Sequence, residues 1–154
     1  MLRVGQQAPD FEVTLHTSET FRLCDELGKR HVVLYFYPRD FTIGCTKEAC
    51  AFTDHFNTIS RLNAAIIGVS PDSVETHREF ARQYSIAFPL AADPALELAR
   101  QYDAVWMGGR AMQRVTYVID RGGCIRLAAH HALFINNHWK RTIDVLQELK
   151  RESS

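Results

Sequence analysis

A cysteine at the expected start of a helix is the strongest candidate for chemistry in the sequence. Cys45 comes three residues after Thr42 and seven after Pro38. An apolar run over 31–37 predicts a buried strand that stops at Pro38, and good helix formers follow Cys45. In a first helical turn, unpaired N–H groups and the helix dipole stabilise an anion, so a thiol there ionises more readily. We therefore expect Cys45 to be a nucleophilic thiolate whose sulfur is exposed.

Each of these three residues also has a common structural role. A buried, inert cysteine is frequent in proteins, Thr42 could cap a helix, and Pro38 could simply end a strand. The spacing favours chemistry, because the Thr42 hydroxyl can turn toward the space in front of the sulfur. Pro38 has no N–H that would hold competing water beside that space.

A second cysteine stands five residues after the first. Along an intact α-helix, Cα atoms five residues apart are separated by roughly 8–9 Å. A disulfide requires less than about 7 Å. If Cys45 and Cys50 form a redox pair, the helix must therefore unwind locally. The alternative is that Cys50 is an ordinary helix residue and that another thiol pairs with Cys45.

The other cysteines and histidines show no metal-binding pattern. C-x4-C is not a usual zinc motif and no second pair completes it, so we expect no metal and no cofactor. Cys24 and Cys124 are expected to be bystanders. We expect His130, His131 and His138 to lie on the surface.

The elements that must position Cys45 alternate between strand and helix, which predicts an α/β fold with a central sheet between helices. Seven segments are expected to be strands, of which the first two form a hairpin, and four to be helices. The strands are a hairpin over 11–15 and 20–23, then 31–37, 64–69, 88–91, 115–119 and 124–129. The helices are 45–62, a helix capped by Ser73, a short one opened by Asp93 and Pro94 and reaching Tyr102, and a last one from Asn136 or Asn137.

Helical spacing also predicts where several side chains point. Ile143, Leu146 and Leu149 should face inward from the last helix, whereas Thr76 and His77 should lie on an outer face. Four aromatic residues are interpreted as core rather than as walls of a substrate pocket. They are Phe36, Phe52, Phe88 and Trp106.

The length of the chain, its charge balance and its first residues argue against several classes of function. A chain of 154 residues is expected to form one domain, 1–154. Lys plus Arg equal Asp plus Glu at 18 each, so neither nucleic acid nor an anionic membrane is expected as a partner. No apolar run is long enough to cross a bilayer, and the first residues do not look like a signal peptide. We expect a cytoplasmic protein, in which cysteines are more often reactive than bridged.

The spacing P-x-x-x-T-x-x-C resembles the active-site signature of the peroxiredoxins. The run F-Y-P-R-D-F-T-I-G-C-T-K-E-A-C over 36–50 is similar to the bacterioferritin-comigratory-protein or peroxiredoxin Q branch. Segments at 4–11, 67–73, 88–94 and 114–120 resemble that branch too. The resemblance covers roughly 4–130, and the tail from 130 to 139 departs from it. It implies a thioredoxin-like fold with an N-terminal β-hairpin and a central mixed sheet flanked by helices.

The resemblance also assigns roles to the residues that match the motif. Cys45 would be the peroxidatic cysteine, whose thiolate attacks a hydroperoxide and becomes a sulfenic acid. Thr42 would hydrogen-bond the peroxide oxygens, and Arg114 would stabilise the thiolate and the departing oxygen. Glu48 would orient Arg114. The alternative for Arg114 and Glu48 is a solvated surface pair that contributes little.

In the resembling branch, a cysteine at the position of Cys50 resolves the sulfenic acid through an intrasubunit disulfide. The implied function is a monomeric thiol peroxidase that reduces hydrogen peroxide and organic hydroperoxides and is recycled by thioredoxin or a similar dithiol protein. One alternative is a thioredoxin-like disulfide exchanger, but that class needs C-x-x-C at the helix start, and 43–46 reads I-G-C-T. The other alternative is a redox-sensing or chaperone-like binding module.

Overall fold

A five-stranded mixed sheet forms the centre of the computed structural model, which describes residues 1–130 and 138–153. The strand order is β5-β4-β3-β8-β9, with β3 parallel to β4 and antiparallel to β8. The predicted α/β class with a mixed sheet is confirmed. The bounds are β3 (His31–Phe36), β4 (Ala64–Ser70), β5 (Leu90–Ala92), β8 (Val115–Ile119) and β9 (Ile125–His130).

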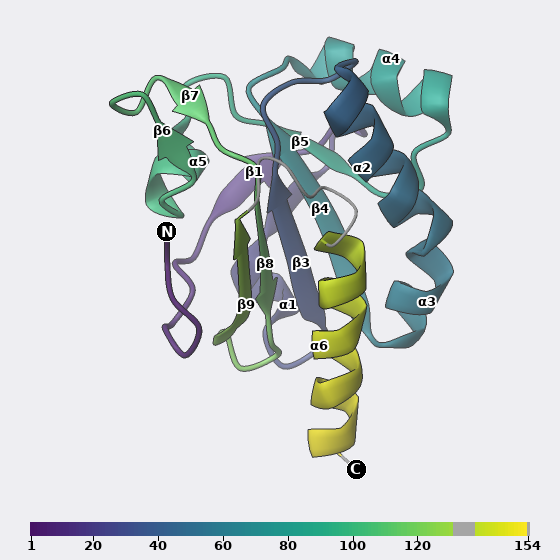
Figure 1. The fold of residues 1–154 in the computed structure, drawn as a ribbon, viewed down its shortest axis with the longest axis vertical. Coiled ribbons are helices and arrows are strands. Elements are labelled where there is room, and N and C mark those ends of the chain that lie inside the picture. The colour runs from purple at the N-terminus through teal and green to yellow at the C-terminus, as the bar shows by residue number, and fades with distance from the viewer. Residues whose placement is uncertain (131–137, 154) are drawn as a thin grey trace.

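Helices cover one face of this sheet, and the N-terminal hairpin with smaller elements covers the other (Figure 1). The first face carries α2 (Ile43–Asp54), α3 (Phe56–Arg61), α4 (Val74–Tyr84) and α6 (His138–Glu152). The second carries β1 (Glu12–Thr14), β2 (Thr20–Arg22), α1 (Leu23–Glu26) and α5 (Glu97–Gln101). A small hairpin, β6 (Val105–Trp106) with β7 (Ala111–Met112), follows α5. Among the described residues, no helix is both long and apolar enough to cross a membrane.

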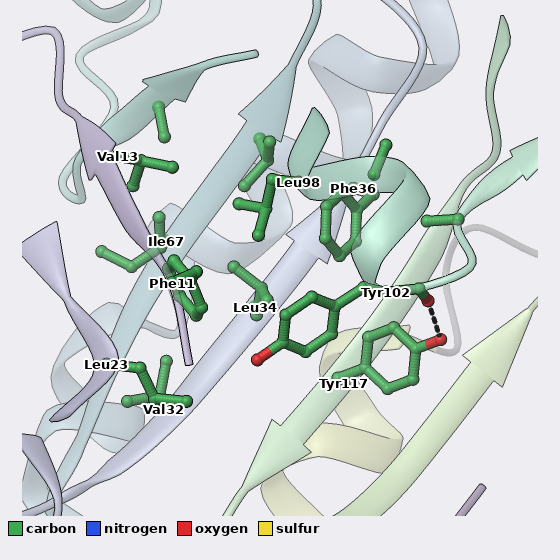
Figure 2. Packing of buried hydrophobic residues seen from close by; sticks show 14 of the residues in the cluster. Phe11, Val13, Leu23, Val32, Leu34, Phe36, Ile67, Leu98, Tyr102 and Tyr117 are labelled. Carbon is green, nitrogen blue, oxygen red and sulfur yellow. Dashed lines mark hydrogen bonds between the residues drawn. The ribbon is translucent and has the colours of Figure 1, made fainter. Parts of the chain in front are cut away.

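The central strand β3 is apolar throughout because both of its faces are covered. Val33 and Tyr35 point into the cluster beneath the helices. Leu34 and Phe36 point into the opposite cluster, where Figure 2 shows Phe11, Tyr102 and Tyr117 packed around them. Each face of the sheet therefore has its own core, and the end of β3 is held rigidly between them.

The predicted helix over 45–62 is wrong in one respect, because the structure divides it into α2 and α3. The backbone leaves helical geometry at His55, where φ is −104° and ψ is 10°. Phe52 and Ile59, on either side of the break, are both fully buried. Apolar spacing reports only which face is buried, and a one-residue break that keeps that face inward leaves the spacing almost unchanged.

The short helix expected from Asp93 and Pro94 begins later, at Glu97 in α5. Leu96, which precedes it, has a left-handed backbone with φ of 58°. The Asp93 carboxylate nevertheless accepts hydrogen bonds from the backbone N–H of Leu98 at 3.2 Å and of Ala99 at 2.9 Å. The Asp93 side chain thus caps the first N–H groups of α5, although Asp93 lies before the helix begins. The predicted start of the last helix at Asn136 or Asn137 lies outside the described residues, as does His131.

Candidate active site

Cys45 lies in the first turn of α2, directly beyond the loop that follows β3. Its side chain is buried, with only 2% exposed, so the expectation of an exposed sulfur is wrong. The reason is that Cys45 starts the inward stripe of α2, followed at helical spacing by the fully buried Ala49 and Phe52. The sulfur therefore sits at the helix start on the face that packs against the sheet.

Arg114 closes over this sulfur from the neighbouring strand. Its Nη2 donates a hydrogen bond to the Cys45 sulfur at 3.1 Å, and its Nη1 donates to Glu48 Oε1 at 3.0 Å. Arg114 immediately precedes β8, whose Val115 pairs with Phe36 at the end of β3. Strand pairing thus brings together groups that are 69 residues apart in the chain.

The Arg114–Glu48 contact is not a solvated surface pair. The side chains are 11% and 1% exposed, respectively. Burial raises the pKa of Glu48 to about 7, against the opposing effect of the Arg114 charge. Glu48 and the Cys45 sulfur therefore share one buried cation in a region where water screens little.

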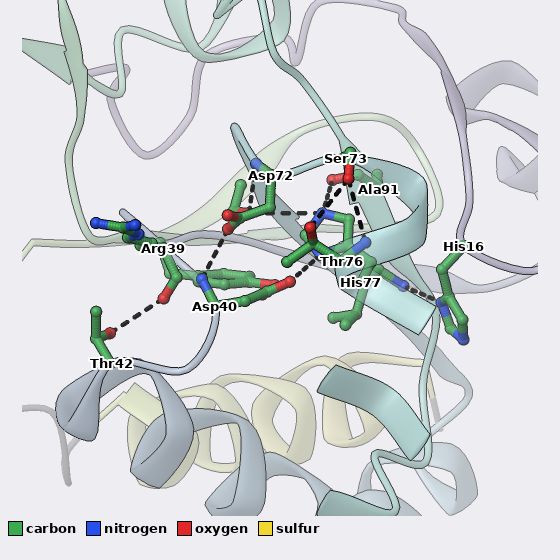
Figure 3. Close-up of polar contacts among 12 residues, drawn as sticks. His16, Arg39, Asp40, Thr42, Asp72, Ser73, Thr76, His77 and Ala91 are labelled. Carbon is green, nitrogen blue, oxygen red and sulfur yellow. Dashed lines mark hydrogen bonds and ion pairs between the residues drawn. The ribbon is translucent and has the colours of Figure 1, made fainter. Parts of the chain in front are cut away.

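Thr42 occupies the N-cap position of α2 without acting as a side-chain cap. Its hydroxyl donates to the Arg39 carbonyl oxygen at 3.0 Å, and it makes no capping bond to the helix (Figure 3). The side chain is exposed at the mouth of the site. The hydroxyl is thus held by the loop and not by α2.

Pro38 lies on the wall of a pocket of about 310 Å³. Arg114, Met112 and Trp106 line the same pocket. Trp106 is 53% exposed, so its interpretation as a core residue is wrong, whereas Phe36, Phe52 and Phe88 are buried. The tight β6–β7 hairpin carries the Trp106 side chain outward, and two residues of strand are too few to show alternation in the sequence.

Cys50 lies on the same helix as Cys45, partly buried and with a free thiol. Burial, and secondarily the charge of Asp54, raise the pKa of the Cys50 thiol. Cys50 is therefore predominantly protonated at neutral pH and is a poor first nucleophile. Cys24 and Cys124 are also free thiols.

A buried polar network behind the loop was missed in the sequence. His77, which we expected on an outer face, is fully buried, and its Nδ1 lies 2.6 Å from Asp40 Oδ2. The Tyr37 hydroxyl donates to Asp40 Oδ1 at 2.5 Å, and the Asp40 backbone N–H donates to Asp72 Oδ2 at 2.7 Å (Figure 3). His77 stands three residues before the buried Phe80, so helical spacing could have placed it on the inward face.

This network fixes the loop and is not assigned as a metal site. Ligand atoms of Asp40, Asp72 and His77 lie within 4.8 Å of one another. Those atoms are already engaged with each other and with Tyr37 and Ser70. Both ring nitrogens of His77 face oxygens, since Nε2 lies 3.1 Å from the Ala91 carbonyl oxygen. The His77 ring is therefore held on both sides, by the Asp40 carboxylate and by the Ala91 carbonyl oxygen.

His138 is also buried, which contradicts its predicted surface position. Its Nδ1 lies 2.7 Å from Thr116 Oγ1 and 3.4 Å from Glu48 Oε2. Thr142 and Leu146, four and eight residues later, are fully buried too. His138 therefore begins the inward stripe of α6, and the same spacing that marked Leu146 and Leu149 would have included it. Ile143 is only partly buried, whereas His130 is exposed as expected.

Comparison with known proteins places this site in a family. Residues 4–128 match the model of the AhpC/TSA family, and the chain belongs to that family. The chain is 37% identical to peroxiredoxin Bcp of Bacillus subtilis over 98% of its own length and 99% of that protein. It is 34% identical to the chloroplastic peroxiredoxin Q of Sedum lineare, over 95% of this chain and 78% of that protein.

Solved structures agree with this assignment. Peroxidoxin BcpB from Mycobacterium tuberculosis superposes with a TM-score of 0.89 at 30% identity, covering 97% of this chain and 99% of that one. The predicted thioredoxin-like fold and the resemblance to the Bcp and peroxiredoxin Q branch are confirmed. The protein is a thiol-dependent peroxidase, and peroxiredoxins use peroxide substrates and thioredoxin-type reductants.

Proposed function

We propose that Cys45 is the peroxidatic cysteine and that Cys50 resolves it within the same chain. The observation that carries the proposal is the forked contact of Arg114, with one nitrogen on the Cys45 sulfur at 3.1 Å and the other on Glu48 at 3.0 Å. A guanidinium fixed in this way stabilises both the thiolate and the negative charge that develops on the departing oxygen. Its orientation is set before the peroxide arrives.

The cycle balances with one peroxide and one dithiol. The Cys45 thiolate attacks one oxygen of the O–O bond, which breaks to give a sulfenic acid and an alkoxide or hydroxide that takes up a proton. The Cys50 thiol then displaces water from the sulfenic acid and forms the Cys45–Cys50 disulfide. Because both residues lie on α2, the first turns of that helix must unwind for this step. Thiol–disulfide exchange with thioredoxin or a similar dithiol restores both thiols.

The proposal needs no residue from a second copy of the chain. All the proposed groups, from Pro38 to Arg114, belong to one chain, so we propose that 1–154 acts as a single-domain monomer. Sedimentation of the reduced and oxidised forms would test this. The four free thiols suit a reducing compartment, and we propose the cytoplasm on that ground.

Substitution of Cys50 tests the resolving role. Cys50→Ser should leave the first oxidation of Cys45 unchanged but stop thioredoxin-supported turnover, whereas Cys45→Ser should abolish both. Mass spectrometry of peptides from the oxidised wild type should show 45 joined to 50. Cys24→Ser and Cys124→Ser are the matched controls and should turn over normally. Sustained turnover by Cys50→Ser, or a link from Cys45 to another cysteine, would refute the assignment.

Loss of the Thr42 hydroxyl should slow the first step without unfolding the protein. Thr42→Val removes a hydroxyl at the mouth of the site that can turn from the Arg39 carbonyl toward the peroxide, and losing one such donor typically slows catalysis by about 10²- to 10³-fold. The folded state should change little, because the hydroxyl bonds only the Arg39 carbonyl and does not cap α2. Stopped-flow oxidation by hydrogen peroxide measures the effect, with Thr42→Ser as the control that keeps the hydroxyl. Equal rates for the valine and serine variants would exclude this role.

A further inference from the structure

The first turn of α6 meets α2 and β8 at a buried point directly behind Arg114. His138 opens α6 with no exposed side-chain surface, and Thr116 lies on β8, two residues after Arg114. The Nδ1 of His138 is 2.7 Å from the Thr116 hydroxyl and 3.4 Å from Glu48 Oε2. The ring is thus fixed by the sheet and turned toward the carboxylate that holds Arg114.

The two oxygens of Glu48 have different surroundings. Oε1 accepts a hydrogen bond from Arg114, whereas Oε2 is buried, accepts no hydrogen bond from the described residues and lies 3.4 Å from His138 Nδ1. Within the described part of the chain, Arg114 is the cation that hydrogen-bonds both the Glu48 carboxylate and the Cys45 sulfur. A polar ring nitrogen this close to Oε2, in a region where water screens little, acts on the carboxylate independently of Arg114 and opposes its rotation away from the guanidinium.

We propose that His138 is a positioning residue of the peroxidase site, which fixes Glu48 through Oε2 so that Arg114 stays on the Cys45 sulfur. The path runs from Thr116 through His138, Glu48 and Arg114 to Cys45, and each step is a contact of 2.7 to 3.4 Å. His138 acts at a distance and touches neither the sulfur nor the substrate space.

The same turn of α6 also holds the far end of α2. The Trp139 ring stacks on His55, the residue after α2, with centroids 3.9 Å apart and planes inclined by 10°. Glu48 in the first half of α2 and His55 beyond its end are therefore both fastened to neighbouring residues of α6. Unwinding the start of α2 to join Cys45 and Cys50 must pull Glu48 away from His138. This consequence rests on the disulfide assigned under the proposed function.

His138 should therefore have opposite effects on the two chemical steps. His138 favours the folded α2 helix, in which peroxide oxidises Cys45. It opposes the unwound helix, in which the disulfide forms. Loss of general stability in α6 would not by itself reposition Arg114. Opposite changes in the two rates, together with slower alkylation of Cys45, distinguish positioning from a merely structural contribution.

The experiment compares His138→Leu with His138→Asn and Thr116→Val. We expect His138→Leu to slow oxidation of Cys45 by on the order of ten- to a hundred-fold, as misplacement of a catalytic group does. It should also speed conversion of the sulfenic acid to the disulfide. His138→Asn keeps an N–H donor and should recover most of the oxidation rate. Thr116→Val leaves the histidine in place but unanchored, and should show a smaller change of the same sign in both steps.

Leu149→Ala is the matched control. Leu149 is buried on the same face of α6, three turns beyond His138, so its truncation weakens the packing of α6 without touching Glu48. Both steps are followed by quenched flow, with a sulfenic-acid trap and with mass spectrometry of the disulfide. Alkylation of Cys45 is measured across pH. The other polar groups that face Glu48 and His138 are Arg114, Cys45, Thr116 and Tyr35, so all of them are kept unchanged in this comparison. Alkylation of Cys45 should be slower in His138→Leu than in the wild type.

Two results would overturn the proposal. One is an oxidation rate and alkylation profile in His138→Leu equal to those of Leu149→Ala. The other is a His138→Asn variant as slow as His138→Leu, since positioning by an N–H should be rescued. If the wild type forms no Cys45–Cys50 disulfide, the proposed resolving step fails, but the oxidation rates still decide the role of His138.

Discussion

In the Arg114→Ala variant, peroxide should oxidise Cys45 about 10²- to 10³-fold more slowly than in the wild type. This is the usual effect of removing one oriented hydrogen-bond donor that stabilises a developing negative charge. The guanidinium is the group that directly contacts the sulfur from outside α2, at 3.1 Å. Without it, the groups of residues 1–130 and 138–153 that are left to stabilise the thiolate and the departing oxygen are the helix start and the Thr42 hydroxyl. Stopped-flow oxidation at several peroxide concentrations gives the second-order rate constant that checks this expectation.

The accompanying variants separate charge from geometry. Arg114→Lys keeps the positive charge but cannot hold the sulfur and Glu48 with one rigid fork, so its rate should fall between those of the wild type and the alanine variant. Arg110→Ala removes an exposed arginine from the turn between β6 and β7 and is the control. A rate for Arg114→Ala within a few-fold of the control would remove Arg114 from the mechanism.

Arg114→Ala should also change how stability depends on pH. Without its cation, the buried Glu48 carboxyl should have a pKa above its present value of about 7. A carboxyl group whose pKa is higher in the folded state than its ordinary 4.5 binds its proton preferentially in that state. The stabilising contribution of this group is present at pH below its ordinary pKa and is lost as the pH rises through its pKa in the folded state. The unfolding free energy of Arg114→Ala should therefore fall more steeply than that of the wild type on going from acid to alkaline pH.

The sequence was sufficient to predict the sheet and the candidate nucleophile. The run over 31–37 is apolar because both faces of β3 are buried, and such a run needs no knowledge of the partner strands. Placing Cys45 at a helix start followed from Pro38 and the helix formers after it. The exposure of Cys45 was mispredicted because the cysteine was considered alone, although Ala49 and Phe52 extend the same helical stripe.

Contacts between distant polar groups could not be predicted from spacing. Arg114 meets Cys45 because β8 pairs with β3 in a register that sets Val115 opposite Phe36, and periodicity does not specify register across 69 residues. His77 and His138 were placed outside because histidine is polar. Helical spacing places each on an inward stripe, where its ring contacts a polar side chain, Asp40 for His77 and Thr116 for His138. Burial of a polar group depends on such a partner, and the identity of a partner on another element leaves no local signal.

Asp40→Ala should be the most destabilising single substitution among those considered, because it leaves two buried polar groups without their hydrogen-bond partner, at a cost of about 1–3 kcal/mol each. Asp40 is 3% exposed and His77 is fully buried. Removal of the carboxylate leaves His77 Nδ1 and the Tyr37 hydroxyl without acceptors. Urea unfolding of Asp40→Ala and of Asp25→Ala, which removes an exposed carboxylate in α1, measures the difference.

Two further variants show whether the loss comes from the unpaired groups. Asp40→Asn keeps an acceptor for Tyr37 and a polar side chain beside His77, so it should lose less stability than Asp40→Ala. The double variant Asp40→Ala with His77→Leu also removes the imidazole that would be left without its partner. It should therefore be more stable than the sum of its single variants predicts, by about 0.5–3 kcal/mol. Additive losses would mean that the two side chains contribute independently.

The same substitution should reach the active site through the loop. Asp40 lies between Pro38 and Thr42, and its backbone N–H is tied to Asp72 at 2.7 Å. Once the side chain no longer holds the loop to His77 and Tyr37, the Thr42 hydroxyl and the start of α2 lose their fixed positions. Cys45 oxidation should then slow in Asp40→Ala even at temperatures where the protein remains folded, and Asp40→Asn should recover most of the rate. An unchanged rate in folded Asp40→Ala would show that β3 and α2 alone position the loop.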